Sequence, residues 1–521
     1  MVDFSITKGV MSMEYIVTAD EMRGYDKNTI EKVEIPALVL MERAAYALAE
    51  EIMKRYLPNL KILAIGGTGN NGGDVFCAGR ILAEYHYNVT FCLVGEYSKC
   101  TIETQKQIKI CKNARLPFVH TDVFWDCDLI IEGIFGIGLN RPPLGLQEEM
   151  IRKINQSGRP VISADIPSGV DSDTGAIYNE AIKADLTVTF AFKKRGHLLY
   201  PGKEYSKEVI CKKIGISDNF FPVEYPGSIS YEKGDIKKIP KRNNTGNKGS
   251  FGKVLIIAGN QNIYGAAYLC ALSAFRMGVG MVMIYTASEN RNSLQKSIPE
   301  ALIETYNETD YAGTKLQKAI EWADYIAIGP GIGTDVIAKK IINQTVHLSM
   351  NKAMVIDADA LNIIASDSYT MENIRASVEK GKPVVFTPHL KEFSRLCGKE
   401  IFEIQKEQIK IVEQYCYDNQ IVLVCKDATT IVCANNQPVY INQSGNAGMA
   451  TAGTGDVLTG IIIALVAQGM SAYEAACMGV FLHGYAGDMC KQKTNSYYLI
   501  ASDIVEQLKY ILKEAEKSES L

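Results

Sequence analysis

The chain has 521 residues, which is more than one hydrophobic core normally organises, so we expect at least two domains. Hydrophobic residues make up 47% of the chain and charged residues 22%, as in ordinary globular proteins. The formal net charge of −4 excludes a basic surplus for nucleic acid or acidic membranes, and no apolar run approaches the ~20 residues of a membrane span.

The N-terminal part of the chain predicts two helices. Its first residues, MVDFSITKGVMSMEYI, contain neither the charged nor the continuous apolar segment of a secretory signal. Because Met11 and Met13 follow, residues 1–12 are a candidate alternative-start extension. The sequence TADE at 18–21 is a capping-box pattern that opens a helix, and residues 38–57 carry apolar side chains at helical spacing.

Short apolar runs then alternate with amphipathic segments. The runs lie at 61–66, 89–95, 128–136, 160–169 and 185–192. Apolar strands separated by helical stretches are typical of a parallel sheet with helices on both faces. We therefore predict a three-layer αβα domain over residues 1–220.

A polar stretch rich in Pro, Gly and Asn follows at 217–247, and we interpret it as a linker centred on 221–234. The alternation then starts again. The second set of apolar runs lies at 253–260, 281–288, 325–333, 353–362, 383–389 and 421–432. This pattern predicts a second three-layer αβα domain over residues 235–521, so the fold class is α/β throughout.

The loop GGTGNNGGD at 66–74 joins the first predicted strand to a helix. Its glycines fit the dinucleotide-binding pattern GxGxxG at Gly67, Gly69 and Gly72. The acidic residue expected about 20 positions later is missing, since the next strand ends as VTFCLVG. Asn70, Asn71 and Asp74 instead add side-chain oxygens to the loop, although an Asp at a helix start is also a common N-cap.

Three more polar residues lie in or just after strands of the first domain. Glu132 lies in the strand at 128–133, Asp165 ends the next one, and Ser168 follows it. Ligands of open parallel sheets bind at the carboxyl ends of the strands. Asn71, Glu132 and Ser168 could therefore converge as oxygen ligands of a hard cation, leaving Asp165 for proton transfer.

The motifs GNNGGD, IFGIGL, SADIPSGVDSDTG and DLTVTFAFKKRGH resemble the NAD(P)H-hydrate epimerase domain, which has a Rossmann-like fold. The resemblance implies equilibration of the R and S hydrates of the reduced nicotinamide ring, with Asp165 as the catalytic and substrate-binding carboxylate. It implies a potassium ion held by Asn71, Glu132 and Ser168. It also implies substrate contacts from Asn70, Asn71, Gly72, Gly73, Asp74, Gly136, Ile137, Gly138, Leu139, Asn140, Arg141 and Pro142.

This chain departs from the epimerase pattern at two positions. Residue 132 is Glu where the family usually has Asp, and residue 75 is Val where Gly is usual. The longer Glu side chain bears on cation affinity more than on the fold. Similar domains also serve as binding scaffolds in RNA-decapping proteins, but the retained Asp165 and GNNGGD favour an active enzyme.

In the second domain, GNAGMATAGTGDVLTG at 445–460 precedes a long apolar run. A glycine loop before a helix binds anions through backbone N–H groups, yet this loop lacks the lysine of a Walker motif and has Leu458 at the sixth position of GxGxxG. Asp456 would also repel a phosphate, so either the loop is only a tight turn or the carboxylate does chemistry beside a phosphate. Lys426 is the candidate positive partner, and His389, after Thr-Pro, ends a strand at the same sheet edge.

The motifs GPGIG, DADALN, TPHLKE, KDATT and GNAGMATAGTGDVLTG resemble the ADP/ATP-dependent NAD(P)H-hydrate dehydratase domain, which has a ribokinase-like fold. The resemblance implies that ADP, with magnesium, phosphorylates the hydrate while Asp456 accepts its hydroxyl proton, giving AMP and phosphate. It implies hydrate contacts from Ala266, Gly329, Gly331, Gly333, His389 and Asp456. It implies nucleotide contacts from Lys426, Asp427, Ala428, Thr429, Thr430, Asn446, Ala447, Gly448, Met449, Ala450, Thr451, Ala452, Gly453, Thr454 and Gly455.

The resemblances together indicate a two-activity enzyme that repairs hydrated NAD(P)H. One alternative is a ribokinase-type kinase of a vitamin precursor, although such kinases do not normally carry the GNNGGD domain. Another is a catalytically dead nucleotide-binding scaffold, which the intact Asp165 and Asp456 argue against.

The cysteines indicate the compartment. There are thirteen, scattered with no Cys-x-x-Cys pair, which argues against a zinc site or a disulfide scaffold and for reduced thiols. We therefore expect a soluble cytoplasmic protein without nucleic-acid or membrane partners. We also expect it to form a homo-oligomer.

Overall fold

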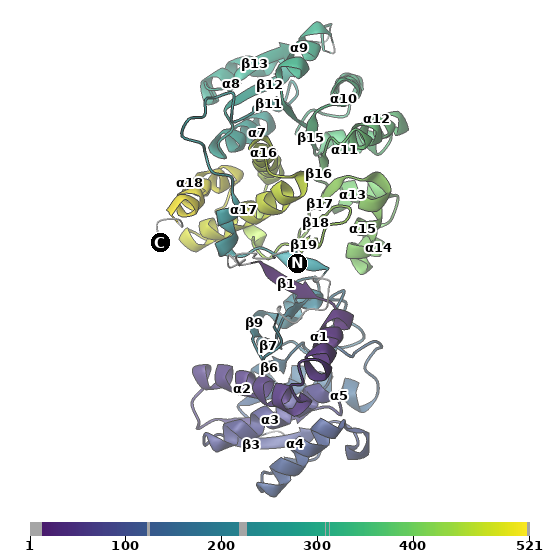
Figure 1. The fold of residues 1–521 in the computed structure, drawn as a ribbon, viewed down its shortest axis with the longest axis vertical. Helices are drawn as coiled ribbons and strands as arrows, with labels where there is room; N and C mark the ends of the chain where they lie inside the picture. The colour runs from purple at the N-terminus through teal and green to yellow at the C-terminus, as the bar shows by residue number, and fades with distance from the viewer. Residues whose placement is uncertain (1–12, 122–125, 218–226, 308, 312, 518–521) are drawn as a thin grey trace, which may run out of the picture. The chain divides into compact units, whose positions relative to one another are not determined.

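The computed structural model describes residues 13–121, 126–217, 227–307, 309–311 and 313–517 (Figure 1). They form two compact units, one of Tyr15–Ser228 and the other of the described residues from Ile229 onward with the short segment before Tyr15. The candidate extension at 1–12 lies outside the described residues. Each unit is an α/β structure, so the predicted fold class is confirmed.

The two helices expected near the N-terminus are present. Helix α1 (Ala19–Glu31) begins at Thr18, whose hydroxyl accepts from the Glu21 backbone N–H while the Glu21 carboxylate accepts from the Thr18 N–H. This reciprocal pair is the predicted capping box. Helix α2 (Ala37–Arg55) follows and buries an apolar face, as its periodicity predicts.

The N-terminal unit contains a fully parallel seven-stranded sheet in the order β4-β3-β2-β5-β6-β7-β9. This is the strand order of a Rossmann fold with one strand added. The strands are β2 (Lys61–Gly66), β3 (Asn88–Leu93), β4 (Phe118–Val119), β5 (Leu129–Gly133), β6 (Val161–Ala164), β7 (Leu186–Phe190) and β9 (Glu208–Lys212). The connecting helices are α3 (Asn70–Glu84), α4 (Ile102–Asn113), α5 (Leu146–Gln156) and α6 (Gly202–Ser206). Two short strands outside this sheet, β1 (Glu14–Val17) and β8 (Lys193–Lys194), pair in parallel.

Alternate residues of β2 reach two different cores. Ile62 and Ala64 belong to the cluster that includes residues of α2 and α3, whereas Leu63 and Ile65 belong to the cluster that includes residues of α5. Because successive side chains of a strand point to opposite faces, the sheet is covered on both sides. The unit therefore has the predicted three layers.

The C-terminal unit repeats the plan in a larger sheet. Its parallel part has the order β13-β12-β11-β14-β15-β16-β17, and β18, β19 and β10 extend it. The strands are β10 (Ser228–Ser230), β11 (Lys253–Ile257), β12 (Met281–Ala287), β13 (Leu302–Tyr306), β14 (Tyr325–Ile328), β15 (Ala353–Ile356), β16 (Val384–Phe386), β17 (Val422–Cys425), β18 (Ile431–Cys433) and β19 (Val439–Ile441). The helices are α7 (Gly265–Arg276), α8 (Arg291–Ser297), α9 (Thr314–Trp322), α10 (Val336–Leu348), α11 (Asp359–Ile364), α12 (Ser368–Glu379), α13 (Leu390–Cys397), α14 (Ile401–Lys406), α15 (Gln408–Asn419), α16 (Thr454–Ala467), α17 (Ala472–Lys493) and α18 (Ala501–Lys517).

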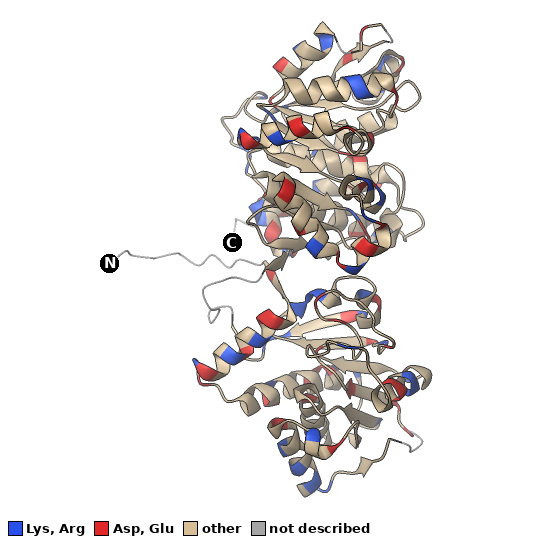
Figure 2. Cartoon of the chain, turned by 90° about the vertical axis from the view of Figure 1, so that its right-hand side faces the viewer, with Lys and Arg blue, Asp and Glu red and all other residues tan. Residues whose placement is uncertain are grey.

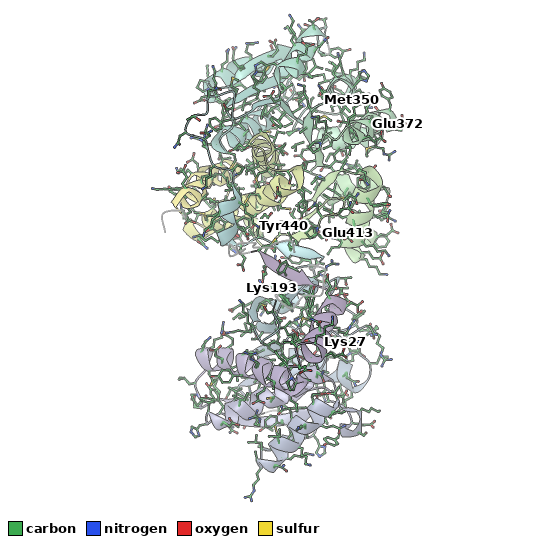
Figure 3. All side chains as sticks on the ribbon, viewed as in Figure 1. Lys27, Lys193, Met350, Glu372, Glu413 and Tyr440 are labelled. Carbon is green, nitrogen blue, oxygen red and sulfur yellow. The ribbon has the colours of Figure 1, made fainter. Side chains whose placement is uncertain are left out.

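Two details of the predicted organisation are wrong. The run at 421–432 is not one strand: β17 and β18 pair antiparallel, so the polar KDATT between them forms a turn. Residues 221–226 of the predicted linker at 221–234 lie outside the described residues, and the rest of it contains the buried strand β10 and the start of a 3-10 helix at Lys233–Lys238. Tyr231, just after β10, packs edge-on against Tyr440, which Figure 3 labels, and this aromatic contact orders a segment whose composition is polar.

Helix α16 lies inside the C-terminal unit. Every residue from Val457 to Ala467 is buried, and the helix contacts α7, α17 and α18 as well as β11, β14 and β15 (Figure 1). A helix that is apolar on all sides is a core helix. Its burial fixes the position of the residues at its N-terminus.

The charged residues and the cysteines are distributed over both units. Acidic and basic residues are interspersed over the helices of both units (Figure 2). All thirteen cysteines carry free thiols, and eleven of them are buried. Among the described residues no helix combines the length and apolar character needed to cross a membrane.

Candidate active sites

The N-terminal unit has a cavity of about 550 Å³ at the carboxyl ends of its central strands. The cavity is lined by many of the residues predicted to contact substrate, namely Asn70, Asn71, Asp74, Gly136, Ile137, Gly138, Leu139 and Asp165. The other five do not line it, namely Gly72, Gly73, Asn140, Arg141 and Pro142. The first two are buried within α3.

The glycine loop lets strand and helix approach closely. A Cβ on Gly67 would lie 2.0 Å from the Ile134 carbonyl oxygen, and one on Gly72 would lie 2.1 Å from the Gly67 carbonyl oxygen. No side chain fits in either gap. The N-cap of α3 is Gly69, so Asp74 is not the helix cap that its position also suggested. Its carboxylate instead lines the cavity.

Asp165 forms an ion pair with Lys194 in the wall of this cavity. Asp165 follows β6 with a left-handed φ of 62°, and its carboxylate contacts the Lys194 ammonium directly. Thr189 donates a hydrogen bond of 3.0 Å to the same carboxylate oxygen. The Lys194 side chain is 1% exposed and that of Asp165 14% exposed, so the pair is removed from water but open to the cavity.

The environment separates the proton affinities of these groups. Burial raises the pKa of Asp165, but the charge and hydrogen bond of Lys194 outweigh it, and the pKa lies below its usual value. Burial, together with the charge of Asp165, raises the pKa of Asp74 well above its usual value and that of Asp26 on α1 to about 6. One ionised carboxylate and two of higher proton affinity therefore face one cavity, an arrangement suited to proton transfer.

The three predicted potassium ligands lie together beside the cavity. The Ser168 hydroxyl donates to Glu132 at 2.6 Å and contacts the Phe135 carbonyl at 3.2 Å, while the Asn71 amide donates to the same carbonyl at 2.7 Å. The Oδ1 atom of Asn71 is buried and has no hydrogen-bond partner within the described part of the chain. The Glu132 carboxylate also accepts from Ser163 and from two backbone N–H groups. The set offers only oxygen ligands, one of them unsatisfied, and so fits a hard cation.

In the C-terminal unit, Lys426 follows β17 and Asp357 follows β15. The Lys426 ammonium lies 2.9 Å from Asp357 Oδ1, and the Thr459 hydroxyl of α16 donates to Asp357 Oδ2 at 2.7 Å. A Cβ on Gly455 would lie 3.3 Å from the Lys426 ammonium. The lysine expected as the positive partner of the glycine loop therefore lies beside that loop.

Asp456 is in the first turn of α16, next to this ion pair. Burial, together with the negative charges of Asp357 and Asp359, raises its pKa to about 7, although the charge of Lys426 opposes them. A carboxylate with a pKa near the working pH is an effective general base. At the same point the N-terminus of α16 offers unpaired backbone N–H groups to an anion.

The loop before α16 has a defined conformation. The Asn446 side chain accepts from the Gly448 N–H at 3.0 Å and donates to Asp488 at 2.9 Å. The Thr454 hydroxyl donates to the carbonyls of Met449 and Thr451. Gly453 has a left-handed φ of 89° as the N-cap of the helix. Internal hydrogen bonds thus preorganise the predicted nucleotide loop.

The predicted hydrate-binding residues line the same edge of the sheet. Gly329 follows β14 with a φ of 123°, and a Cβ there would lie 1.9 Å from the Asp357 carbonyl oxygen. Gly331 lies against Ala266. His389 also has a structural role, since its Nδ1 accepts from the N–H groups of Lys391 and Glu392 and caps α13.

Sequence reasoning missed several polar residues of the two sites. Asp26 lines the first cavity from α1. Lys194 lies in the motif DLTVTFAFKKRGH and Asp357 in the motif DADALN, but neither was predicted to have a role. Thr459 stood unassigned within the glycine-rich stretch. Only Asp357 carries a local signal, because it directly follows an apolar strand and a charge at such a position needs a partner when it is buried.

Comparison with known proteins gives matches for both units. A family model described as YjeF-related protein N-terminus matches residues 37–196, and one described as NAD(P)H-hydrate dehydratase matches residues 254–509. The chain is 31% identical to the bifunctional NAD(P)H-hydrate repair enzyme of Moorella thermoacetica, over 96% of this chain and 97% of that protein. It is 33% identical to the enzyme of the same name from Dictyoglomus turgidum, over 96% and 98%. A solved ribokinase-like superfamily protein from Enterococcus faecalis is 27% identical, with a TM-score of 0.49, over 57% of this chain and 99% of that one.

Proposed function

Because the chain belongs to the family of bifunctional NAD(P)H-hydrate repair enzymes, we propose that it restores hydrated NADH and NADPH through two activities. The N-terminal unit interconverts the R and S hydrates. The C-terminal unit dehydrates the S hydrate at the expense of ADP. The observation that carries this proposal is the position of Asp456, a carboxylate with a pKa of about 7 beside an anion-binding helix N-terminus.

Dehydration begins with phosphoryl transfer to the hydroxyl of the hydrated ring. Asp456 accepts the hydroxyl proton as the oxygen attacks the terminal phosphate of ADP, and AMP leaves. Phosphate then departs from the ring carbon, the neighbouring carbon loses a proton, and the ring double bond is restored. The net reaction converts hydrate and ADP into NAD(P)H, AMP and phosphate.

Different groups of the protein bind the phosphoryl group, the nucleotide and the hydrate. Backbone N–H groups at Gly453–Gly455 stabilise the phosphoryl group in transit. Lys426–Thr430 and Asn446–Gly455 hold the nucleotide, while Ala266, the glycines at 329, 331 and 333, and His389 hold the hydrate with Asp456. We expect magnesium to accompany the nucleotide phosphates and offset their negative charge. ADP, rather than ATP, is the proposed donor.

Epimerisation requires the hydroxyl of the hydrated carbon to leave and return on the other face. We assign the catalytic role to Asp165, which Lys194 keeps ionised and which can balance the positive charge on the ring after the hydroxyl leaves. Asp74, whose pKa is raised, can supply the proton that the departing hydroxyl needs. Gly136–Leu139 and Asn70 form the remaining contacts from the cavity wall.

A potassium ion is the proposed companion of the epimerase site. Asn71, Glu132 and Ser168 would hold it, and the unsatisfied Asn71 oxygen supports this assignment. When bound, the ion would add positive charge beside the loop that carries Phe135 and Gly136. The Glu132 carboxylate also accepts four hydrogen bonds from Ser163, Ser168 and the Ile134 N–H, and these fix its orientation.

We also propose a cytoplasmic location, which the thirteen free thiols support. The assembly as a homo-oligomer stays a prediction.

One assay tests the whole proposal. The protein is mixed with the separated R and S hydrates of NADH and either ADP or ATP, and recovery of the reduced-nicotinamide absorbance is followed. Recovery from both hydrates is expected. Recovery from the S hydrate alone would contradict the epimerase assignment, and no recovery with either nucleotide would contradict the proposal as a whole.

Two matched variants assign the sites. Asp456→Asn should lower nucleotide-dependent recovery by about 10²–10⁴-fold and spare epimer interconversion, since it removes only a general base. Asp165→Asn should give the opposite pattern. Loss of both activities in either variant would indicate that the two sites are wrongly assigned.

A further inference from the structure

Asp357 has no role in the chemistry described so far, yet both of its carboxylate oxygens are engaged. It is 1% exposed and lies at the carboxyl end of β15. One oxygen pairs with the Lys426 ammonium at 2.9 Å, and the other accepts from the Thr459 hydroxyl at 2.7 Å. The residue therefore links the end of a strand to the first part of α16.

The partner of the Asp357 carboxylate is Lys426, whose side chain is flexible unless other groups hold it. A lysine ammonium is a point charge on a flexible four-carbon stem, unlike the planar fork of arginine. Lys426 lies beside Gly455, and the position that a Cβ on Gly455 would take is 3.3 Å from the ammonium and 3.9 Å from Asp357 Oδ2. The missing side chain at 455 leaves the ammonium room against the first turn of α16.

We propose that Asp357, itself held by Thr459, is a positioning residue that fixes the Lys426 ammonium at the glycine-rich N-terminus of α16, where the transferred phosphoryl group passes. This inference rests on the dehydratase activity proposed above. Displacing a group that stabilises a transition state by about 1 Å lowers rates by about 10²-fold, so the restraint is catalytically important.

The same geometry ties Asp357 to the proton acceptor. Asp456 feels the negative charges of Asp357 and Asp359 and the positive charge of Lys426. The Cys270 thiol of α7 also lies within its field and stays neutral, because burial raises the pKa of Cys270 well above its usual value. His389 and Glu392 of α13 face Lys426 from the neighbouring strand end. Removing the charge at 357 takes a negative neighbour away from Asp456 while the positive charge of Lys426 remains, so Asp456 should ionise at lower pH.

If Asp357 positions Lys426, removing its charge should affect ADP affinity and turnover differently. Removing a buried negative charge beside Lys426 strengthens the attraction of the site for the phosphates of ADP. The ammonium is then free to move toward the bound nucleotide and away from the place where transition-state charge develops. ADP should therefore bind as tightly as before or more tightly, while turnover falls.

The test measures dehydration of the S hydrate of NADH between pH 5 and 9, and ADP affinity by calorimetry, for the full chain and its variants. For Asp357→Asn we expect kcat to fall by about 10–100-fold with no loss of ADP affinity. The acid limb of kcat/KM should move to lower pH. Asp357→Glu should have a lower kcat, but the acid limb of its kcat/KM profile should stay near that of the parent, because the negative charge remains.

Thr459→Val supplies a second variant that keeps the side-chain shape and removes only the 2.7 Å hydrogen bond. It should lower kcat in the same direction by a smaller factor. Asp367→Ala is the matched control, because Asp367 caps α12 through Tyr369 and Thr370 in the same unit. It should leave the acid limb in place.

Weaker ADP binding in Asp357→Asn, or an unmoved acid limb, would overturn the positioning role. If the parent chain binds ADP but restores no NADH, the proposed function fails instead. In that case the ADP affinities of the parent and of Asp357→Asn, measured by calorimetry, still test the role of Asp357. A lower affinity in the variant contradicts the inference.

Discussion

Replacing Lys194 by Met should destabilise the N-terminal unit and abolish epimerisation. Lys194 is 1% exposed and forms an ion pair with Asp165, whose side chain is 14% exposed. Removing one partner of a buried pair strands the other charge and costs about 3–5 kcal/mol, far more than the ~0–1 kcal/mol of a surface pair. Lys194 also contacts the Thr189 hydroxyl at 2.8 Å and the Phe190 carbonyl at 3.3 Å, and those groups lose a donor as well.

The folding stability lost in Lys194→Met should depend on pH. In the parent chain Lys194 lowers the pKa of Asp165, so the pair stabilises the fold above the unfolded pKa of Asp165 and that stability disappears as the pH falls through the folded value. In the variant Lys194 no longer offsets the burial of Asp165, so the folded pKa rises and the penalty grows as the pH rises. The stability difference between the two proteins should therefore be largest near neutral pH and shrink toward pH 4.

Native-state hydrogen exchange of peptides from β7 (Leu186–Phe190) measures this free energy within the N-terminal unit. The double variant Lys194→Met/Asp165→Asn is the control, because a neutral pair leaves no stranded charge. It should recover stability to within about 1 kcal/mol of the parent but no epimerase activity. A single-variant loss below about 1 kcal/mol, or a double variant no more stable than the single one, would refute the reasoning.

Three further predictions concern other parts of the two sites. Replacing potassium by lithium, or Asn71 by Ala, should slow epimer interconversion and leave dehydration of the S hydrate unchanged; equal slowing of both activities would argue against a cation at the N-terminal site. His389→Asn should preserve the cap of α13, and so the melting temperature, while raising KM for the hydrate. An unchanged KM would mean that His389 has only a structural role. His389→Ala should lose about 1 kcal/mol of stability, because it removes the cap. Gly329→Ala should impair dehydration and lower the melting temperature, because its Cβ would lie 1.9 Å from the Asp357 carbonyl oxygen; a folded, fully active variant in the same assay would contradict this.

Local patterns were enough to predict the regular part of the fold. The capping box at 18–21 and the apolar runs are properties of a few neighbouring residues, and they correspond to α1 and to central strands of both sheets. Strand β10, which the composition did not predict, depends on distant contacts. Strand β10 has only three residues, two of them serines, and it is recognisable only beside β19 and with Tyr231 against Tyr440.

The same distinction applies to the sites. Glycine-rich loops and carboxylates at strand ends are visible in the sequence, and Asp165, Asp74 and Lys426 lie where that reasoning puts them. Pairings are not visible in this way. Lys426 and Asp357 are 69 positions apart, and Lys194 and Asp165 are 29 apart, so only the folded sheet brings each pair together. The structural role of His389 as a helix cap was likewise hidden, because imidazole is an uncommon cap.

The burial of α16 from Val457 onward also bears on how this chain can diversify. A change of side-chain size from Val457 to Ala467 disturbs the packing around the helix, so the residues that support Asp456 tolerate few such substitutions. Apart from the buried Thr429, the residues of the turn at 427–430 and of the loop at 446–452 are at least partly exposed. Nucleotide preference can therefore drift between relatives through these two surface segments, while the proton acceptor and its helix stay the same.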